Sequence, residues 1–149
     1  MTAEELASVT YDTDFYLWTQ QQAALLQQGQ LQAVDVANLA EEIESMGRSD
    51  KRALRSYLSI IVQHLLKWQY QPGLRGSSWK SSINNGREQV GWILKESPSL
   101  ASQSPILLAD AYPLARRNAS AETGLRLSTF PNQCPFTVEQ VLDAEYWPD

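Results

Sequence analysis

Large apolar side chains recur every three or four residues through the middle of this 149-residue chain. The clearest run is Leu54, Leu58, Ile61, Leu65 and Trp68, at intervals of four, three, four and three. Because a helix turns once in about 3.6 residues, such a run lies along one side of a helix and must pack against neighbours. Strand-like alternation is nearly absent. The spacing predicts an all-α fold, an up-and-down bundle of about five helices with a short C-terminal helix.

Gly and Pro residues divide the chain into successive helical segments. Gly47 is expected to end one helix and to turn the next one back as an antiparallel hairpin. Thr137 and Gln140 form a capping box for the last helix. Gly86 lies inside a helical stripe, where it either admits a close neighbour or marks a kink. The predicted helices cover 12–29, 35–46, 49–68, 79–93, 105–124 and 138–147.

Length and composition predict one globular domain over residues 1–149, with residues 1–10 as a flexible N-terminal tail. Cys134 is the only cysteine and has no partner for an internal disulfide. The first thirty residues lack a basic start followed by an apolar run, so we expect a cytoplasmic protein and not a secreted one. No apolar run approaches the roughly 20 residues that span a bilayer, which predicts no membrane association.

Charge is distributed unevenly along the chain. Residues 1–47 hold eight acids and no base, residues 48–126 hold twelve bases and five acids, and residues 127–149 hold four acids and no base. A basic middle segment could contact nucleic acid or an acidic partner. Packing of acidic against basic helices explains the pattern more simply, and we favour internal neutralisation. In the expected hairpin this pairing is structural and fixes the register, each exposed pair contributing under about 1 kcal/mol. The paired side chains are Glu41, Glu42, Glu44, Arg52 and Arg55.

The sequence lacks the usual sets of catalytic and metal-binding residues. One histidine and one cysteine are too few for a zinc site, and no glutamate stands three residues before His64 as di-iron bundles require. We therefore expect no metal, no cofactor and no catalytic residues. His64 is interpreted as a histidine at the edge of the core. The alternative is a nuclease-like hydrolase that uses His64 with arginine and glutamate side chains of neighbouring helices, although Arg55 lies nine residues away, about 13 Å along the helix.

A basic, aromatic-rich stretch is the best candidate for a binding face. Interleaved cations and aromatic rings resemble a stacking surface for single-stranded nucleic acid. Trp68 and Trp79 also fall on apolar stripes, so closing the end of the core is the simpler role. The predicted function is a non-enzymatic binding or regulatory module with an unknown protein partner, while nucleic acid and a second copy of the chain stay open as partners. The candidate face comprises His64, Lys67, Trp68, Arg75, Trp79, Lys80 and Arg87.

Several ordered motifs together indicate a family. The stretches YDTDFYLW, NLAEEIESMG, HLLKWQYQP, AETGL and FPNQCPFTVEQVLDAEYWP resemble the family catalogued as domain of unknown function 29. The resemblance extends from about Tyr11 to Pro148. It implies an all-helical domain found mainly in cyanobacteria and some other bacteria. It carries over no established activity and no catalytic residues.

Overall fold

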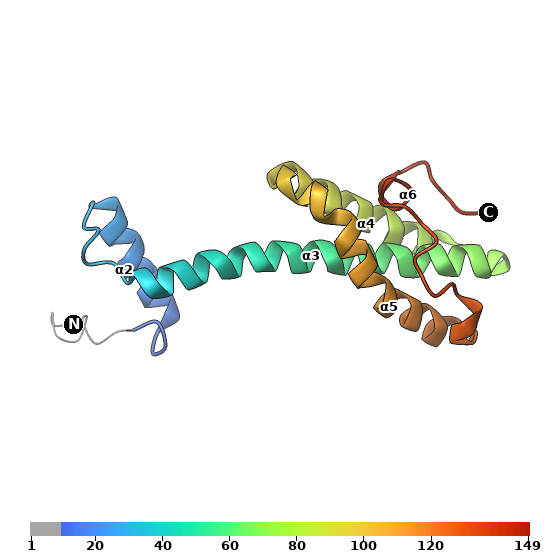
Figure 1. Ribbon diagram of the computed structural model, residues 1–149, viewed down its shortest axis with the longest axis horizontal. Coiled ribbons are helices and arrows are strands. Elements are labelled where there is room, and N and C mark those ends of the chain that lie inside the picture. Colours follow the sequence, from blue (N-terminus) through green and yellow to red (C-terminus); the bar gives the residue numbers. More distant parts are fainter. Residues whose placement is uncertain (1–9) are drawn as a thin grey trace. The chain divides into compact units, whose positions relative to one another are not determined.

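The structure is a computed structural model that describes residues 10–149 (Figure 1). The described part is helical and has no strand, which confirms the all-α fold with a short C-terminal helix. Of the predicted tail, residues 1–9 lie outside the described part. The helices are α2 (Phe15–Gln27), α3 (Val36–Tyr70), α4 (Ser77–Glu96), α5 (Ser104–Thr123) and α6 (Val138–Leu142), with 3-10 turns at Pro72–Leu74, Pro98–Gln103 and Leu127–Thr129.

The predicted hairpin at Gly47 is wrong, because α3 runs through this residue without a break for 35 residues. A mid-helix glycine costs about 1 kcal/mol relative to alanine, which is too little to stop a helix that is favoured on both sides. Arg48 bonds to Glu41 at 2.9 Å and pairs with Glu44 at 3.7 Å, so its contacts span Gly47. Segments 35–46 and 49–68 are therefore parts of one helix.

Contacts divide the chain into two compact units, Met1–Arg48 and Ser49–Asp149, called here the N-terminal and C-terminal units. Helix α3 contributes residues to both. The expectation of a single domain stays a prediction.

Side-chain capping organises the described part of the N-terminal unit. Asp14 caps α2 by accepting a bond from the Leu17 amide at 3.0 Å, one or two residues later than expected. The buried indole of Trp18 donates to Asp35 at 3.1 Å, and the side-chain oxygen of Gln22 accepts from the Asp35 amide at 2.7 Å. The Asp35 side chain in turn accepts from the Asn38 amide, in the first turn of α3, at 3.4 Å. These bonds join α2 to the start of α3.

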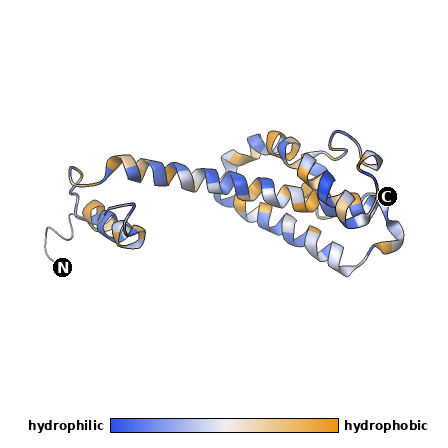
Figure 2. Cartoon of the chain, turned by 90° about the horizontal axis from the view of Figure 1, so that it is seen from below, coloured by the Kyte–Doolittle hydropathy of each residue, from blue (hydrophilic) through white to orange (hydrophobic). Residues whose placement is uncertain are grey.

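The C-terminal unit contains the hydrophobic core. The predicted stripe from Leu54 to Trp68 is buried, and hydrophobic residues gather where α3 meets α4 and α5 (Figure 2). Helix α4 continues through Gly86, and a Cβ placed there would lie 2.5 Å from Ile61 Cγ1. Gly86 thus admits a close neighbour. The capping box of Thr137 and Gln140 begins α6 as predicted.

Candidate functional site

The predicted basic, aromatic-rich face is built around two tryptophans of the C-terminal unit. Trp68 is only 8% exposed and packs against Trp147, with ring centroids 4.8 Å apart. Trp79 is half-buried, and the Lys67 ammonium lies 4.9 Å from the centre of its ring. The guanidinium of Arg75 lies 5.0 Å from the Trp68 ring. The structure therefore brings the predicted aromatic and basic residues together, but it uses Trp68 as part of the core.

Most cations of this face are already bonded within the chain. Lys67 pairs with Glu122 of α5 at 2.7 Å, and this bond is the main cause that lowers the pKa of the Glu122 carboxyl. Arg75 donates to the carbonyl oxygens of Trp68 at 2.8 Å and Pro148 at 3.3 Å. Lys80 is exposed, and its described interaction is a ring contact at 5.8 Å from Trp68.

Arg87 is buried, with 7% of its surface exposed. Its guanidinium donates to the carbonyl oxygens of Val141, Gln140 and Tyr146 at 2.8, 3.2 and 2.9 Å. It also lies 5.3 Å from the ring centre of Trp147. Burial lowers the pKa of this group, although an arginine stays charged at neutral pH. Arg87 thus anchors the C-terminal segment to α4.

His64 is half-exposed, and its Nδ1 donates to the Ile60 carbonyl oxygen of its own helix at 2.8 Å. A hydrolase needs a second polar group within hydrogen-bond reach of the catalytic histidine. Within residues 10–149, no direct hydrogen bond joins His64 to another ionisable side chain. The hydrolase alternative stays a prediction.

The acidic residues predicted to pair across a hairpin have other neighbours. Glu41 and Glu44 contact Arg48 of the same helix, and Glu42 accepts a hydrogen bond from the Tyr11 hydroxyl. The predicted partners Arg52 and Arg55 follow farther along α3. Because Glu42 and Arg52 are ten residues apart on one helix, their backbones are separated by about 15 Å. The predicted register role required the hairpin that the structure lacks.

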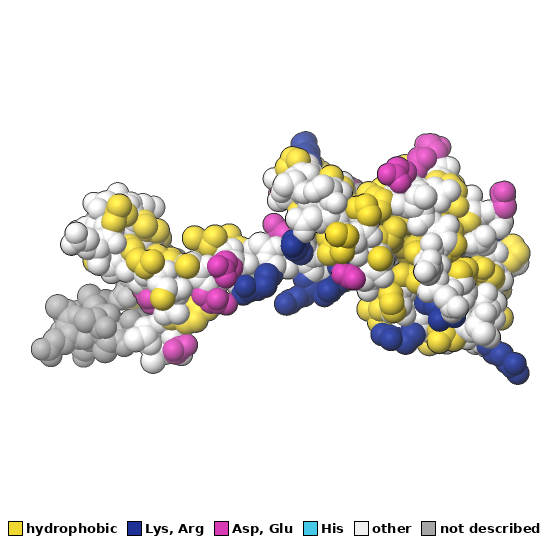
Figure 3. All heavy atoms as spheres, in the orientation of Figure 1, with side chains coloured by type: hydrophobic (Ala, Val, Ile, Leu, Met, Phe, Trp, Pro, Cys, Tyr) yellow, Lys and Arg dark blue, Asp and Glu magenta, His cyan; other side chains and the backbone are white. Residues whose placement is uncertain are grey.

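An exposed apolar strip occupies the first part of α3. Val36, Leu39, Ile43 and Met46 follow one another at intervals of three, four and three, which places them on one side of the helix. Val36 is 66% exposed, Ile43 and Met46 are each 67% exposed, and Leu39 is half-buried. We call these four residues the α3 stripe. Figure 3 shows hydrophobic and acidic side chains next to one another along this part of α3.

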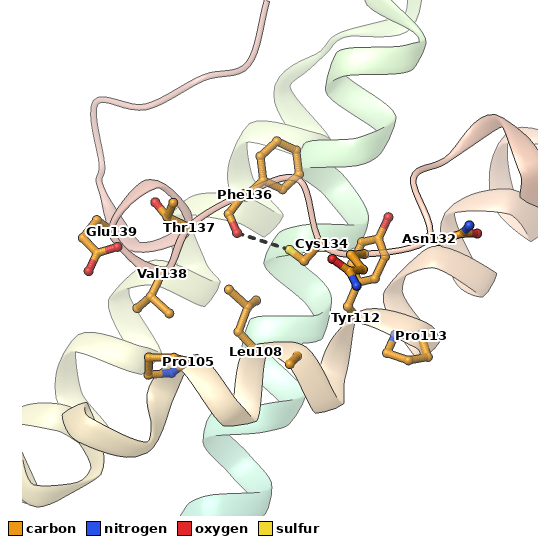
Figure 4. A pocket seen from close by; sticks show the side chains of 12 residues that line it. Pro105, Leu108, Tyr112, Pro113, Asn132, Cys134, Phe136, Thr137, Val138 and Glu139 are labelled. Carbon is orange, nitrogen blue, oxygen red and sulfur yellow. Dashed lines mark hydrogen bonds between the residues drawn. The ribbon is translucent and has the colours of Figure 1, made fainter.

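A cavity of about 550 Å³ lies in the C-terminal unit between α5 and the segment that leads into α6. Leu108 and Tyr112 of α5 face Cys134, Phe136 and Val138 across it (Figure 4). The other lining residues are Pro105, Ala109, Pro113, Asn132, Gln133, Thr137 and Glu139. The walls are mainly apolar, and Glu139 is the single charged residue among the lining residues.

Two ionisable groups of the cavity are held in their neutral forms. Burial raises the pKa of Tyr112 to about 12, and the Tyr112 hydroxyl donates to the Pro131 carbonyl oxygen at 2.6 Å. Burial also raises the pKa of the Cys134 thiol, which donates to the Phe136 carbonyl oxygen at 3.4 Å. A nucleophilic cysteine needs the opposite shift, toward the thiolate. The arrangement suits packing and not covalent catalysis.

The described part of the chain was also compared with the requirements of a metal site and of a membrane-spanning helix. Within residues 10–149, no three His, Cys, Asp or Glu side chains are grouped so that they could hold a metal ion. None of the described helices combines the length and the hydrophobicity that crossing a bilayer requires.

Sequence reasoning missed the partners that complete the basic, aromatic-rich region. Glu122 and Trp147 lie more than fifty residues from the side chains that they contact, so no local pattern connects them. The spacing of the α3 stripe is visible in the sequence, but its exposure was not predicted. Two features of the sequence could have predicted it. Acidic residues lie around the stripe, and a single glycine such as Gly47 costs too little to end a helix.

A family model described as "Domain of unknown function DUF29" matches residues 10–147. No curated protein matches the chain, and no solved structure matches it. The matched region contains the α3 stripe, the cavity and the basic, aromatic-rich face.

Proposed function

We propose that this chain, which belongs to the family described as domain of unknown function DUF29, is a non-enzymatic protein-binding module. The α3 stripe is the proposed binding surface. The observation that carries this proposal is the exposure of Val36, Ile43 and Met46, each about two-thirds open to solvent on one side of a helix.

Leaving such a stripe in contact with water is unfavourable in free energy. Full burial of one large aliphatic side chain is worth roughly 1.5–3 kcal/mol, so covering several of them provides a substantial driving force for association. Part of this gain is offset by the loss of rotational and translational freedom on binding. Single exposed apolar residues need no explanation, whereas a contiguous set on a regular face marks an interaction surface.

The basic, aromatic-rich face supports the proposal less well. Lys67, Arg75 and Arg87 already bond to groups of the same chain, and Trp68 is buried. A partner that used these side chains would have to displace internal contacts. Lys80 and the half-buried Trp79 are the members of that face with the fewest competing bonds.

Site-specific photocrosslinking tests the proposal in the cells that naturally make the protein. A photoreactive phenylalanine analogue would replace Ile43 or, as a matched control, Ile106 of α5, which is also 67% exposed. We expect a specific protein adduct from position 43 and none from position 106, and the adduct should disappear when Val36 and Met46 are both changed to Ser. Equal adducts at both positions, or no adduct at position 43, would contradict the proposal.

A further inference from the structure

We infer that the partner of the α3 stripe is a basic amphipathic helix of another protein. This inference rests on the proposed binding function and specifies the chemistry of the partner. It follows from the shape of the stripe, from the charges around it and from the poor fit of a second copy of the chain.

The shape of the stripe fits a helix. Its four residues extend over eleven residues of α3, a rise of about 15 Å, in a narrow line at intervals of three and four. A second helix presents apolar ridges with the same intervals, so the two rows can interlock. An added β-strand would need free backbone groups at a sheet edge, and α3 uses its backbone groups in its own helical bonds.

The charges beside the stripe are negative. At 100° of rotation per residue, Asp35 and Glu42 lie next to it on one side, whereas Glu44 lies about 120° from its centre. Residues 10–48 carry six acidic side chains and one basic side chain, Arg48, which already contacts Glu41 and Glu44. A partner helix therefore gains most when Lys or Arg flanks its apolar row.

Two of these carboxylates are held in place by their own unit. Asp35 accepts from the Trp18 indole at 3.1 Å and from the Asn38 side chain at 2.8 Å. Glu42 accepts from the Tyr11 hydroxyl. A carboxylate accepts several hydrogen bonds, so both can still receive a lysine or arginine donor. Because they are already positioned, little side-chain entropy is lost when a cation binds.

A second copy of the chain fits less well than a basic helix. Antiparallel pairing of two stripes would place Val36 opposite Met46 and Leu39 opposite Ile43. The same arrangement brings Glu42 of both copies to the centre of the contact, together with the neighbouring acids. Like charges across an interface oppose association.

Binding of designed peptides to the full chain tests the inference. The probe is a fluorescent helical peptide of about 18 residues with Leu at intervals of three and four and Lys on both flanks, and its matched control has Glu in place of every Lys. Fluorescence anisotropy at low and at physiological ionic strength should show binding of the Lys peptide that weakens with salt, and no binding of the Glu peptide. Changing both Ile43 and Met46 to Ser should weaken binding about tenfold or more, while Ile106→Ser should leave it unchanged.

Three results would overturn the inference. They are equal binding of the Glu peptide, Lys-peptide binding that is unaffected when Ile43 and Met46 are both changed to Ser, and dimerisation of the chain alone that is lost in Ile43→Ser when mass is measured by light scattering. If the crosslink at position 43 forms while any of these results is obtained, the binding function stands and only the assigned partner chemistry fails. Loss of both signals rejects the two proposals together.

Discussion

Single side chains determine how the C-terminal segment is held. Arg87 satisfies three carbonyl oxygens beyond the start of α6, and Arg116 donates to the Phe130 carbonyl oxygen at 3.0 Å. Hydrogen bonds from charged donors are worth more than neutral ones, roughly 1.5–3 kcal/mol each when buried. The planar fork of arginine presents five donors in a fixed geometry that can reach two or three separate acceptors, whereas lysine presents three donors on one compact, flexible ammonium group. Arg87 and Arg116 are therefore structural groups, although Arg87 was predicted to belong to a binding face.

The raised pKa of Tyr112 predicts that the folded protein loses stability at high pH. Its folded pKa of about 12 lies above the ordinary value of 10.0, so its hydroxyl stays protonated in the folded state while the unfolded state ionises. This contribution to stability is fully present below pH 10 and is lost as the pH rises toward 12. In this range the free energy of unfolding falls by up to about 1.4 kcal/mol per pH unit.

Urea unfolding between pH 9 and 12 would measure this effect, with Tyr112→Phe as the comparison. The variant loses the bond to Pro131, about 0.5–1.5 kcal/mol, at every pH below 10, but its free energy of unfolding should fall less steeply above pH 10. The raised pKa of the Cys134 thiol also lowers stability at high pH. The Cys134→Ser variant removes this contribution, so that the contribution of Tyr112 can be measured by itself. Equal slopes for wild type and Tyr112→Phe would refute the assignment.

At the scale of elements, α3 shows that a glycine acts through its surroundings. A Cβ at Gly47 would meet nothing within 4 Å, whereas a Cβ at Gly86 would meet the Ile61 side chain. Both glycines lie inside helices and have negative φ, so neither needs the left-handed conformation. Gly47 therefore lies in open space, whereas Gly86 lies where α4 packs closely against α3.

The two glycines give a matched pair of substitutions. Gly47→Ala should stabilise the helix around it by up to about 1 kcal/mol, because alanine has the better helix propensity and no steric conflict. Gly86→Ala should destabilise the protein, because overpacking costs about 1–3 kcal/mol and exceeds the propensity gain. Circular dichroism during urea unfolding measures both. A loss of stability in Gly47→Ala would show that this part of α3 has a close neighbour.

At the scale of the whole molecule, burial is unequal between the two units. Every buried residue of α3 lies at Leu54 or beyond, and the buried side chains described in the N-terminal unit are Trp18 and Gln22. Local opening of a helix is opposed mainly by its buried apolar contacts. The part of α3 from Leu54 onward is therefore stabilised by buried contacts, and the part before Leu54 has few of them.

Hydrogen exchange should detect this difference along α3. Amides of residues 40–48 should exchange roughly a hundredfold or more faster than those of residues 58–68, since each 1.4 kcal/mol of opening free energy is a factor of ten. Mass spectrometry of short peptic fragments measures both segments in one sample. Uniform protection along the helix would mean that the α3 stripe is covered in solution.

The sequence alone determined the helical class, the buried run from Leu54 to Trp68 and the cap at Thr137, because these depend on residues a few positions apart. It did not determine that α3 continues through Gly47, since the cost of one glycine is comparable to the salt bridges that span it. Which charges are free was decided by tertiary structure. Lys67 meets Glu122 and Arg87 meets Val141 across more than fifty residues of chain, and the same long-range packing formed the cavity.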